Sequence, residues 1–290
     1  MDTSPAANPA PPAVVAAPGR RPRSGRSALR MLGNETAKGL LIWWANRATI
    51  LPELLVLAGL FLALQYLLGG GRIVAELVAP TMLGFLPYVF AYQVVIKLVA
   101  GVVEELQAGT MEQAHLSPLP AWLLSLGRLG SAIVQGLLPT ILLGAGYLIG
   151  LDAALDIDLP WRWPALLPAV LLVVDVAGLA LLLGGLALRV PTVGAVTHVL
   201  LSLVMLINGA FVPISAFPDW LQALARLAPT TLGVEVSRAM LLDGQPLPAA
   251  WSDHSLQLLV LHAVVSLVAG WTLWQWNIRR GLRTGRLGPQ

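Results

Sequence analysis

The chain has 290 residues, of which 57% are hydrophobic and only 11% are charged. A soluble domain carries roughly 25% charged residues, so a soluble fold of this size could not cover its surface with polar groups. The formal net charge is only +3, and the absence of cysteine excludes disulfides and cysteine-based metal sites. The basic residues gather in the two tails with no interleaved aromatic surface, so no nucleic-acid partner is expected. Composition therefore indicates an integral membrane protein.

The first part of the chain is polar and basic. Residues 1–34 are rich in Ala, Pro, Gly and Arg and show no apolar periodicity, which predicts a disordered, basic, cytosolic tail. Residues 35–49 form a helix candidate that carries the adjacent indoles Trp43 and Trp44, and indole rings favour the membrane–water interface. We expect an interfacial helix there. The alternative is that these residues are the first turns of the first span.

Six apolar stretches follow, each close to the 20 or so residues that a helix needs to cross the hydrocarbon core. They predict an all-α integral membrane protein with six transmembrane helices in a permease domain covering residues 35–280. The expected spans are residues 50–69, 77–99, 129–150, 165–188, 192–213 and 255–277.

The placement of basic residues predicts the orientation of these spans. With the N-terminus in the cytosol, 14 of the 18 basic residues fall on the cytosolic side and four on the outside. This positive-inside bias places both termini in the cytosol, including a C-terminal tail at 281–290, and an even number of spans agrees with it. Sixteen of the basic residues are Arg, a usage that suggests a GC-rich bacterial genome and hence the plasma (inner) membrane of a bacterium.

The connection at about 100–128 is too long to be a plain turn and lies on the predicted cytosolic side. Helix breaks at Gly109 and at Ser117-Pro118 leave room for a short helix from Thr110 to Leu116, with Thr110 as its N-cap. Several acids, including Glu105 and Glu112, accompany it. Such an acidic, capped helix suits docking to another protein, and an ordinary solvated loop is an equally good interpretation from chemistry alone.

The run Glu-x-x-x-Gly-Thr-x-Glu…Ser-Pro in this connection resembles the stretch after the second span of type-2 ABC exporter permeases, a family that includes drug, polysaccharide and natural-product exporters. In that family the stretch is a coupling helix that contacts the nucleotide-binding subunit. The resemblance implies that role for six residues. These are Glu105, Gly109, Thr110, Glu112, Ser117 and Pro118.

The connection at about 214–254 lies on the predicted outer side. Asp219 to Leu227 has an apolar face and a polar face but would be only about 15 Å long as a helix, so it cannot cross the bilayer. A second short helix is predicted from about Thr231 to Leu242, with Glu235 and Arg238 placed to pair along it. Asp243-Gly244 should end it.

This outer segment also resembles the exporter family, in which short re-entrant helices between the fifth and sixth spans form the outer gate. The matching residues assigned to that gate are Asn208, Gly209, Phe211, Pro213, Pro218, Trp220, Glu235 and Arg238. Ser215, Leu221 and Pro229 match as well. Taken together, the two segments and the span count extend the resemblance over residues 35–280, and the long basic tail before residue 35 has no counterpart in it.

Asp175 is an acid near the middle of the fourth span. A central acid costs about 2.5–3.5 kcal/mol on insertion scales, so it should face the protein interior or a cavity. It can be a substrate or conformational site, or a buried interhelical or dimer contact, and the sequence names no partner for it. His198 and His262 stand alone in their spans, so no metal site is expected.

No phosphate-binding G-x-x-x-x-G-K-[ST] loop and no hydrolase motif occurs in the sequence. The chain is therefore expected to be no enzyme and to bind no cofactor, with ATP and Mg²⁺ held by a partner. The resemblance implies two copies of a soluble ABC ATPase and a second permease chain, as a homodimer or heterodimer, that together export a hydrophobic or amphipathic substrate. Alternatives are an ion-gradient-driven transporter, an intramembrane enzyme and a non-transporting membrane partner.

Overall fold

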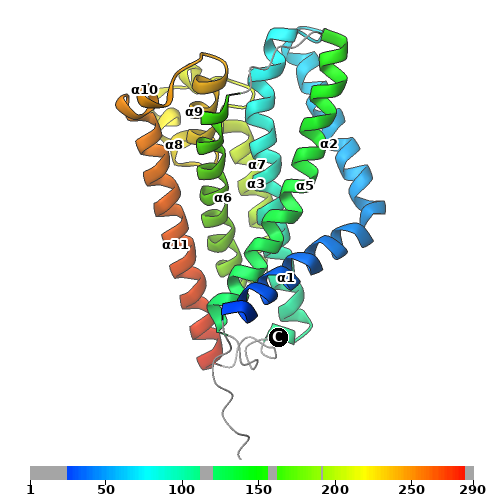
Figure 1. Ribbon diagram of the computed structural model, residues 1–290, viewed down its shortest axis with the longest axis vertical. Coiled ribbons are helices and arrows are strands. Elements are labelled where there is room, and N and C mark those ends of the chain that lie inside the picture. The colour runs from blue at the N-terminus through cyan, green and yellow to red at the C-terminus, as the bar shows by residue number, and fades with distance from the viewer. Residues whose placement is uncertain (1–24, 112–119, 156–161, 191, 285–290) are drawn as a thin grey trace, which may run out of the picture.

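A computed structural model describes residues 25–111, 120–155, 162–190 and 192–284. Within these ranges every regular element is a helix, and most of the helices stand side by side as an elongated bundle (Figure 1). The prediction of an all-α protein is confirmed for this part of the chain. Most of the tail at 1–34 and most of the C-terminal tail lie outside it.

Five helices are long and apolar enough to cross a membrane by length and composition. They are α2 (Arg47–Leu68), α3 (Ala75–Gln107), α5 (Ala121–Leu155), α6 (Leu166–Ala187, preceded by the 3₁₀ turn η1, Trp163–Ala165) and α11 (Ser255–Thr284). Prolines lie inside α2, α3 and α5. Membrane helices tolerate proline because neighbouring groups can satisfy the freed carbonyls. These helices correspond to five of the six expected spans.

The expected fifth span is shorter than the sequence suggests. Helix α7 runs Val193–Ile207, and its 15 residues rise only about 22 Å, less than the roughly 30 Å hydrocarbon core. The chain leaves the helix at Asn208 rather than at Pro213, because Gly209 adopts φ of +82° and the Asn208 side-chain oxygen accepts a hydrogen bond from the Ala210 amide. The described residues thus hold five full-length apolar helices and one shorter apolar helix.

The lead helix is longer than expected. Helix α1 runs Gly25–Ala45, so it begins ten residues before the predicted start at 35 and takes up the end of the segment predicted to be disordered. It lies obliquely across the foot of the bundle and packs against α5 (Figure 1). Gly39 of α1 permits this approach, because a Cβ there would lie 2.1 Å from the Ser131 hydroxyl oxygen.

The tightest helix pair in the core is α6 with α11. A Cβ at Gly270 would lie 2.1 Å from the Gly178 carbonyl oxygen, so the two backbones meet where neither residue has a side chain. Helix α3 packs against both α5 and α6. The main hydrophobic cluster is built from these helices around the fully buried indole of Trp274.

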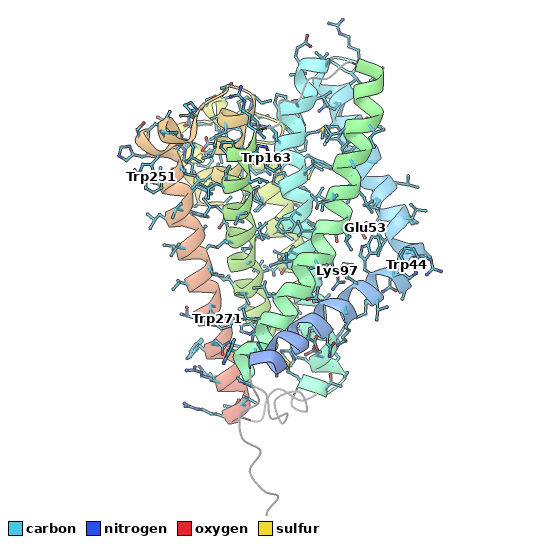
Figure 2. The ribbon with its side chains drawn as sticks, viewed as in Figure 1. Trp44, Glu53, Lys97, Trp163, Trp251 and Trp271 are labelled. Atoms are coloured by element: carbon cyan, nitrogen blue, oxygen red, sulfur yellow. The ribbon has the colours of Figure 1, made fainter. Side chains whose placement is uncertain are left out.

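The outer surface of the bundle is apolar. On α11 the exposed residues include Leu258, Leu261, Val265 and Val268, and exposure of such a stripe to water would be unfavourable. Exposed Trp163 and Trp251 lie near one end of the bundle, Trp271 lies toward the other, and exposed Trp44 lies at a level between them (Figure 2). Indoles at two levels are typical of the two interfaces of a bilayer. The protein is therefore a multi-pass membrane protein.

Candidate functional site

Two ends of the bundle carry the segments that sequence analysis singled out. The end of α3, the start of α5 and the C-terminal end of α11 lie together at one end (Figure 1). At the other end the chain forms η2 (Ile214–Ala216), α8 (Asp219–Leu227), α9 (Thr231–Leu241) and α10 (Leu247–Ser252). The predicted short helices at 219–227 and at about 231–242 are both present.

The predicted break in the connection after α3 is confirmed. Gly109 adopts φ of +65°, a left-handed conformation that favours glycine, and the chain resumes helical structure at Thr110 and Met111. The Met111 side chain is fully buried in the main hydrophobic cluster, which holds the start of the segment on the bundle. Glu112, Ser117 and Pro118 lie outside the described residues.

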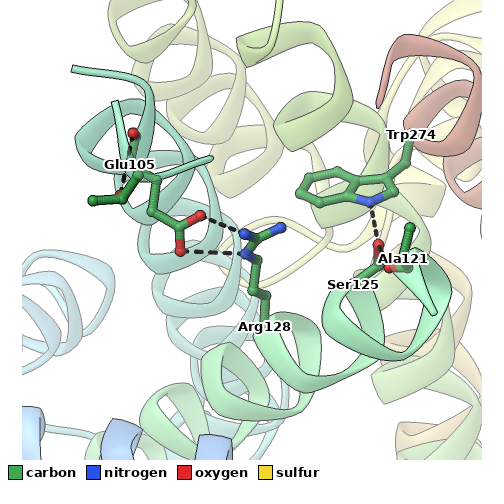
Figure 3. A network of polar contacts seen from close by, with 6 residues as sticks. Glu105, Ala121, Ser125, Arg128 and Trp274 are labelled. Carbon is green, nitrogen blue, oxygen red and sulfur yellow. Dashed lines mark hydrogen bonds and ion pairs between the residues drawn. The ribbon is translucent and has the colours of Figure 1, made fainter. Parts of the chain in front are cut away.

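Glu105, predicted to contact a partner, is engaged inside the chain. Both of its carboxylate oxygens accept hydrogen bonds from the Arg128 guanidinium, one of them over 3.2 Å, so the end of α3 is bound to the start of α5 (Figure 3). The two side chains are 30% and 12% exposed. The neighbouring Glu104 is exposed. Of the two adjacent acids, Glu104 faces outward and Glu105 faces Arg128.

A second contact at this end joins α5 to α11. The buried Trp274 indole N–H donates to the Ser125 hydroxyl oxygen over 2.8 Å, and that hydroxyl donates to the Ala121 carbonyl oxygen (Figure 3). Nearby, the Asn277 amide donates to the Gly185 carbonyl oxygen of α6 over 2.7 Å. Sequence analysis missed these residues, because a lone Trp or Asn in an apolar run gives no signal of its partner. Helices α3, α5, α6 and α11 are thus linked by side-chain hydrogen bonds near the segment that begins at Gly109.

At the opposite end, the predicted gate residues divide into a buried turn and an exposed rim. Asn208 donates to the Gly84 carbonyl oxygen over 3.3 Å, and a Cβ at Gly84 would lie 2.3 Å from the Cα of Ala210. The Phe211 ring lies 6.4 Å from that of Phe85. These contacts fix the turn after α7 against α3. Pro213, Pro218 and Trp220 are exposed.

The expected pair between Glu235 and Arg238 is not formed. Arg238 donates to the carbonyl oxygens of Pro80, over 3.0 Å, and Ala210, over 3.2 Å, so it joins α9 to α3 and to the turn after α7. Glu235 lies 3.8 Å from Arg226 instead. Burial raises the pKa of the Glu235 carboxyl, against the opposing effect of Arg226 and Arg238. Three-residue spacing allowed the pair, but in the folded chain the Arg238 guanidinium binds the backbone carbonyls of Pro80 and Ala210 instead.

Asp175 and His262, which the sequence left without partners, meet each other. His262 Nδ1 lies 3.0 Å from Asp175 Oδ1, and Asp175 Oδ2 accepts a hydrogen bond from the Thr230 amide over 3.2 Å. The other ring nitrogen of His262, Nε2, lies 3.2 Å from the Leu227 carbonyl oxygen. The buried-contact interpretation of Asp175 describes this geometry. The two residues join α6, α11 and the turn between α8 and α9.

A third polar group faces away from the α6–α11 pair. Gln93 of α3 donates to the Glu53 carboxylate of α2 over 2.8 Å, and the Tyr92 hydroxyl lies 3.2 Å from His198 Nδ1 of α7. Lys97 follows Gln93 one turn along α3, and Figure 2 shows it with Glu53 between the two ends of the bundle. All except Gln93 are at least partly exposed. His198 therefore has a partner that sequence analysis did not foresee.

The comparison with protein families decides the identity of the chain. The model of the ABC-2 type transporter family matches residues 35–242, more than two thirds of the chain. The chain belongs to the ABC-2 type transporter family. No curated protein matches it. As an ABC-2 protein it is a membrane permease subunit of an ABC-type transporter, a component that has no ATPase site of its own and normally works with an ATPase subunit.

Proposed function

We propose that this ABC-2 permease is the membrane subunit of a bacterial exporter that moves a hydrophobic or amphipathic substrate outward across the inner membrane. Two copies of a soluble ATPase supply the energy, with ATP and Mg²⁺ bound on those subunits. The family match over residues 35–242 is the observation on which the proposal rests, because it includes both the coupling segment and the outer segment.

The end of the bundle that carries Gly109 and Thr110 suits attachment of the ATPase. Glu104 presents an exposed acid there, and Glu105 holds the segment to α5 through Arg128. A displacement of the segment would reach α5 directly, and α11 through the Ser125–Trp274 hydrogen bond. Rigid helices joined by such contacts can carry a two-state rearrangement from a nucleotide site to distant spans.

The polar group of Glu53, Gln93, Tyr92 and His198 supports a second permease chain on the α2–α3–α7 side. Ionisable side chains within spans usually face a protein interior or a water-filled cavity, because contact with lipid is unfavourable. Glu53 lies about 9 Å along α2 from Arg47, at a depth where lipid would otherwise surround it. We propose that this side lines the space between two permease chains and that an amphipathic substrate places its polar part there.

Reconstitution tests the function. The permease and the ATPase encoded next to it are placed in proteoliposomes, and uptake of a lipid-like dye into inside-out vesicles is followed with ATP or with a non-hydrolysable analogue. Uptake that needs ATP hydrolysis supports the proposal. Uptake driven by an imposed ion gradient without the ATPase would instead establish the secondary-transporter alternative.

A further inference from the structure

The Asp175–His262 contact lies inside the apolar spans, in the half of the bundle nearer the α8–α9 segment. Asp175 is ten residues into α6 and His262 eight residues into α11, each roughly 10–14 Å from the start of its helix. The Asp175 side chain is 2% exposed and that of His262 is 20% exposed. Their partners, the Leu227 carbonyl and the Thr230 amide, lie on either side of the α8–α9 turn.

The oxygen atoms beside His262 bear on how many protons the Asp175–His262 pair holds. Both ring nitrogens of His262 face an oxygen, the Asp175 carboxyl on one side and the Leu227 carbonyl on the other. A neutral imidazole has one N–H, so with an ionised Asp175 it would leave one nitrogen lone pair against an oxygen lone pair. Two protonation forms avoid this: imidazolium with carboxylate, or neutral imidazole with a protonated carboxyl that donates to Nδ1.

Both of these forms contain the same number of protons and carry no net charge. Removal of one proton leaves a net negative charge on a group inside an apolar span, where an isolated charge is costly. It also leaves the Leu227 carbonyl or the Asp175 carboxylate without its donor. The Nδ1–Oδ1 distance of 3.0 Å and the distance of 3.2 Å from Nε2 to the Leu227 carbonyl oxygen fit the fully protonated group.

The turn that this group holds is strained. Thr230 adopts φ of +76°, a left-handed conformation that costs a non-glycine residue on the order of 1–2 kcal/mol. Its hydroxyl and that of Thr231 are buried with no hydrogen-bond partner. The Thr230 amide is satisfied by Asp175, so the carboxyl helps to keep the turn in a conformation that it would otherwise leave.

Among the described residues, the ion-pair partner of His262 is Asp175. Other titratable groups at this end include Asp243, Asp253 and His254 in the loops that flank α10, and Asp253 binds the Ser255 amide and the Gln245 side chain. Helix α8 contributes Arg226 and α9 contributes Glu235 and Arg238, which contact each other or backbone carbonyls rather than His262. Asp219 lies at the far end of α8 and is exposed, α10 has no titratable side chain, and on α11 the remaining charged residues lie at the opposite end.

We infer that Asp175 and His262 are positioning residues that share a proton to fasten the α8–α9 segment to α6 and α11, and that loss of this proton releases the segment. The fastened arrangement is present at low pH and is lost as the pH rises and the shared proton leaves. Any effect on transport rests on the proposed function, but the release itself is a property of this chain alone.

A distance measurement tests the inference in the full chain. Because the sequence has no cysteine, nitroxide labels can be placed by Leu224→Cys on α8 and Leu258→Cys on α11, both 50% exposed. The distance distribution is recorded in lipid nanodiscs at about pH 6 and at about pH 9. These values lie below and well above the ordinary imidazole pKa of about 6.5. We expect one narrow distribution at the lower pH and an added, longer population at the higher pH. An unchanged distribution would overturn the inference.

Three variants give the same measurement its controls. Asp175→Asn can accept from the Thr230 amide and donate to His262 Nδ1 with no titratable proton, so the narrow distribution should persist at both pH values. His262→Leu removes the donor to Leu227 and should show the longer population at both. His198→Gln, a histidine on α7, should keep the pH response of the native chain. A pH response in Asp175→Asn equal to the native one would assign the effect to another group and refute the inference.

Discussion

At the scale of single residues, the Arg128 guanidinium shows how a charge is accommodated beside apolar spans. It is 12% exposed and bound to the Glu105 carboxylate in bidentate geometry, which satisfies both charges where water has little access. Removal of one partner leaves the other charge poorly solvated. The pair therefore fixes the relative position of α3 and α5 and makes each residue dependent on the other.

We predict that Arg128→Met destabilises the detergent-solubilised permease by about 1–3 kcal/mol, between the values for exposed and for buried pairs. Thermal unfolding followed by circular dichroism measures the change. Glu105→Leu combined with Arg128→Met should recover much of the loss, because no unpaired charge remains. Lys38→Met, at an exposed cation of α1, should change the stability little. Equal losses in Arg128→Met and Lys38→Met would show that the pair is not structural.

At the scale of elements, the conformation of Gly109 directs the segment after it, proposed to couple the permease to the ATPase, away from the axis of α3. A residue with a Cβ at φ of +65° would incur a cost of about 1–2 kcal/mol, so the segment would leave α3 in another direction. The attachment of Met111 in the hydrophobic cluster would be disturbed with it. A change at this one residue should therefore act on docking rather than on membrane insertion.

We expect Gly109→Ala to lower transport per ATP hydrolysed by the assembled complex several-fold while leaving the amount of inserted permease unchanged. The measurement is the ratio of substrate flux to phosphate release in proteoliposomes. Gly101→Ala is the matched control, because a Cβ at that helical position of α3 meets no atom within 4 Å. A normal ratio in Gly109→Ala would argue against the docking role, and so would an equal loss in both variants.

At the scale of the whole molecule, the two ends of the bundle differ in charge. The end with the α6–α7 connection and the C-terminus of α11 carries Arg189, Arg279, Arg280 and Arg283. At the other end Arg238 is bound to backbone carbonyls, Arg226 lies beside Glu235, and Arg72 and Arg162 are exposed. Cations tend to stay on the cytosolic side during insertion, so we expect the end with more of them to lie in the cytosol.

We predict that a membrane-impermeant maleimide, added to intact cells, labels Ser252→Cys and does not label Arg283→Cys. Both positions are exposed and the natural chain has no thiol, so each variant reports one end of the bundle. Permeabilised cells should show labelling of both. The reverse pattern in intact cells would invert the assigned orientation and place the coupling segment outside.

The sequence by itself determined the membrane class and the approximate positions of most of the helices. Those properties follow from local composition: apolar runs of sufficient length, glycine and proline breaks, and the placement of arginine. It placed α8 at Asp219–Leu227 correctly because its two-faced pattern is contained within the segment. The sequence also predicted the helix break at Gly109, because that break depends on a single glycine.

Only the tertiary structure decided which polar groups meet. Asp175 and His262 are far apart in the chain and become neighbours because Gly178 and Gly270 let α6 and α11 approach closely. Arg238 binds one carbonyl of α3 and one of the turn after α7 rather than Glu235. Helix α7 ends at Ile207, and the Asn208 side chain that follows it binds α3. These contacts depend on how helices that are distant in the sequence pack together, and a local sequence pattern does not contain that information.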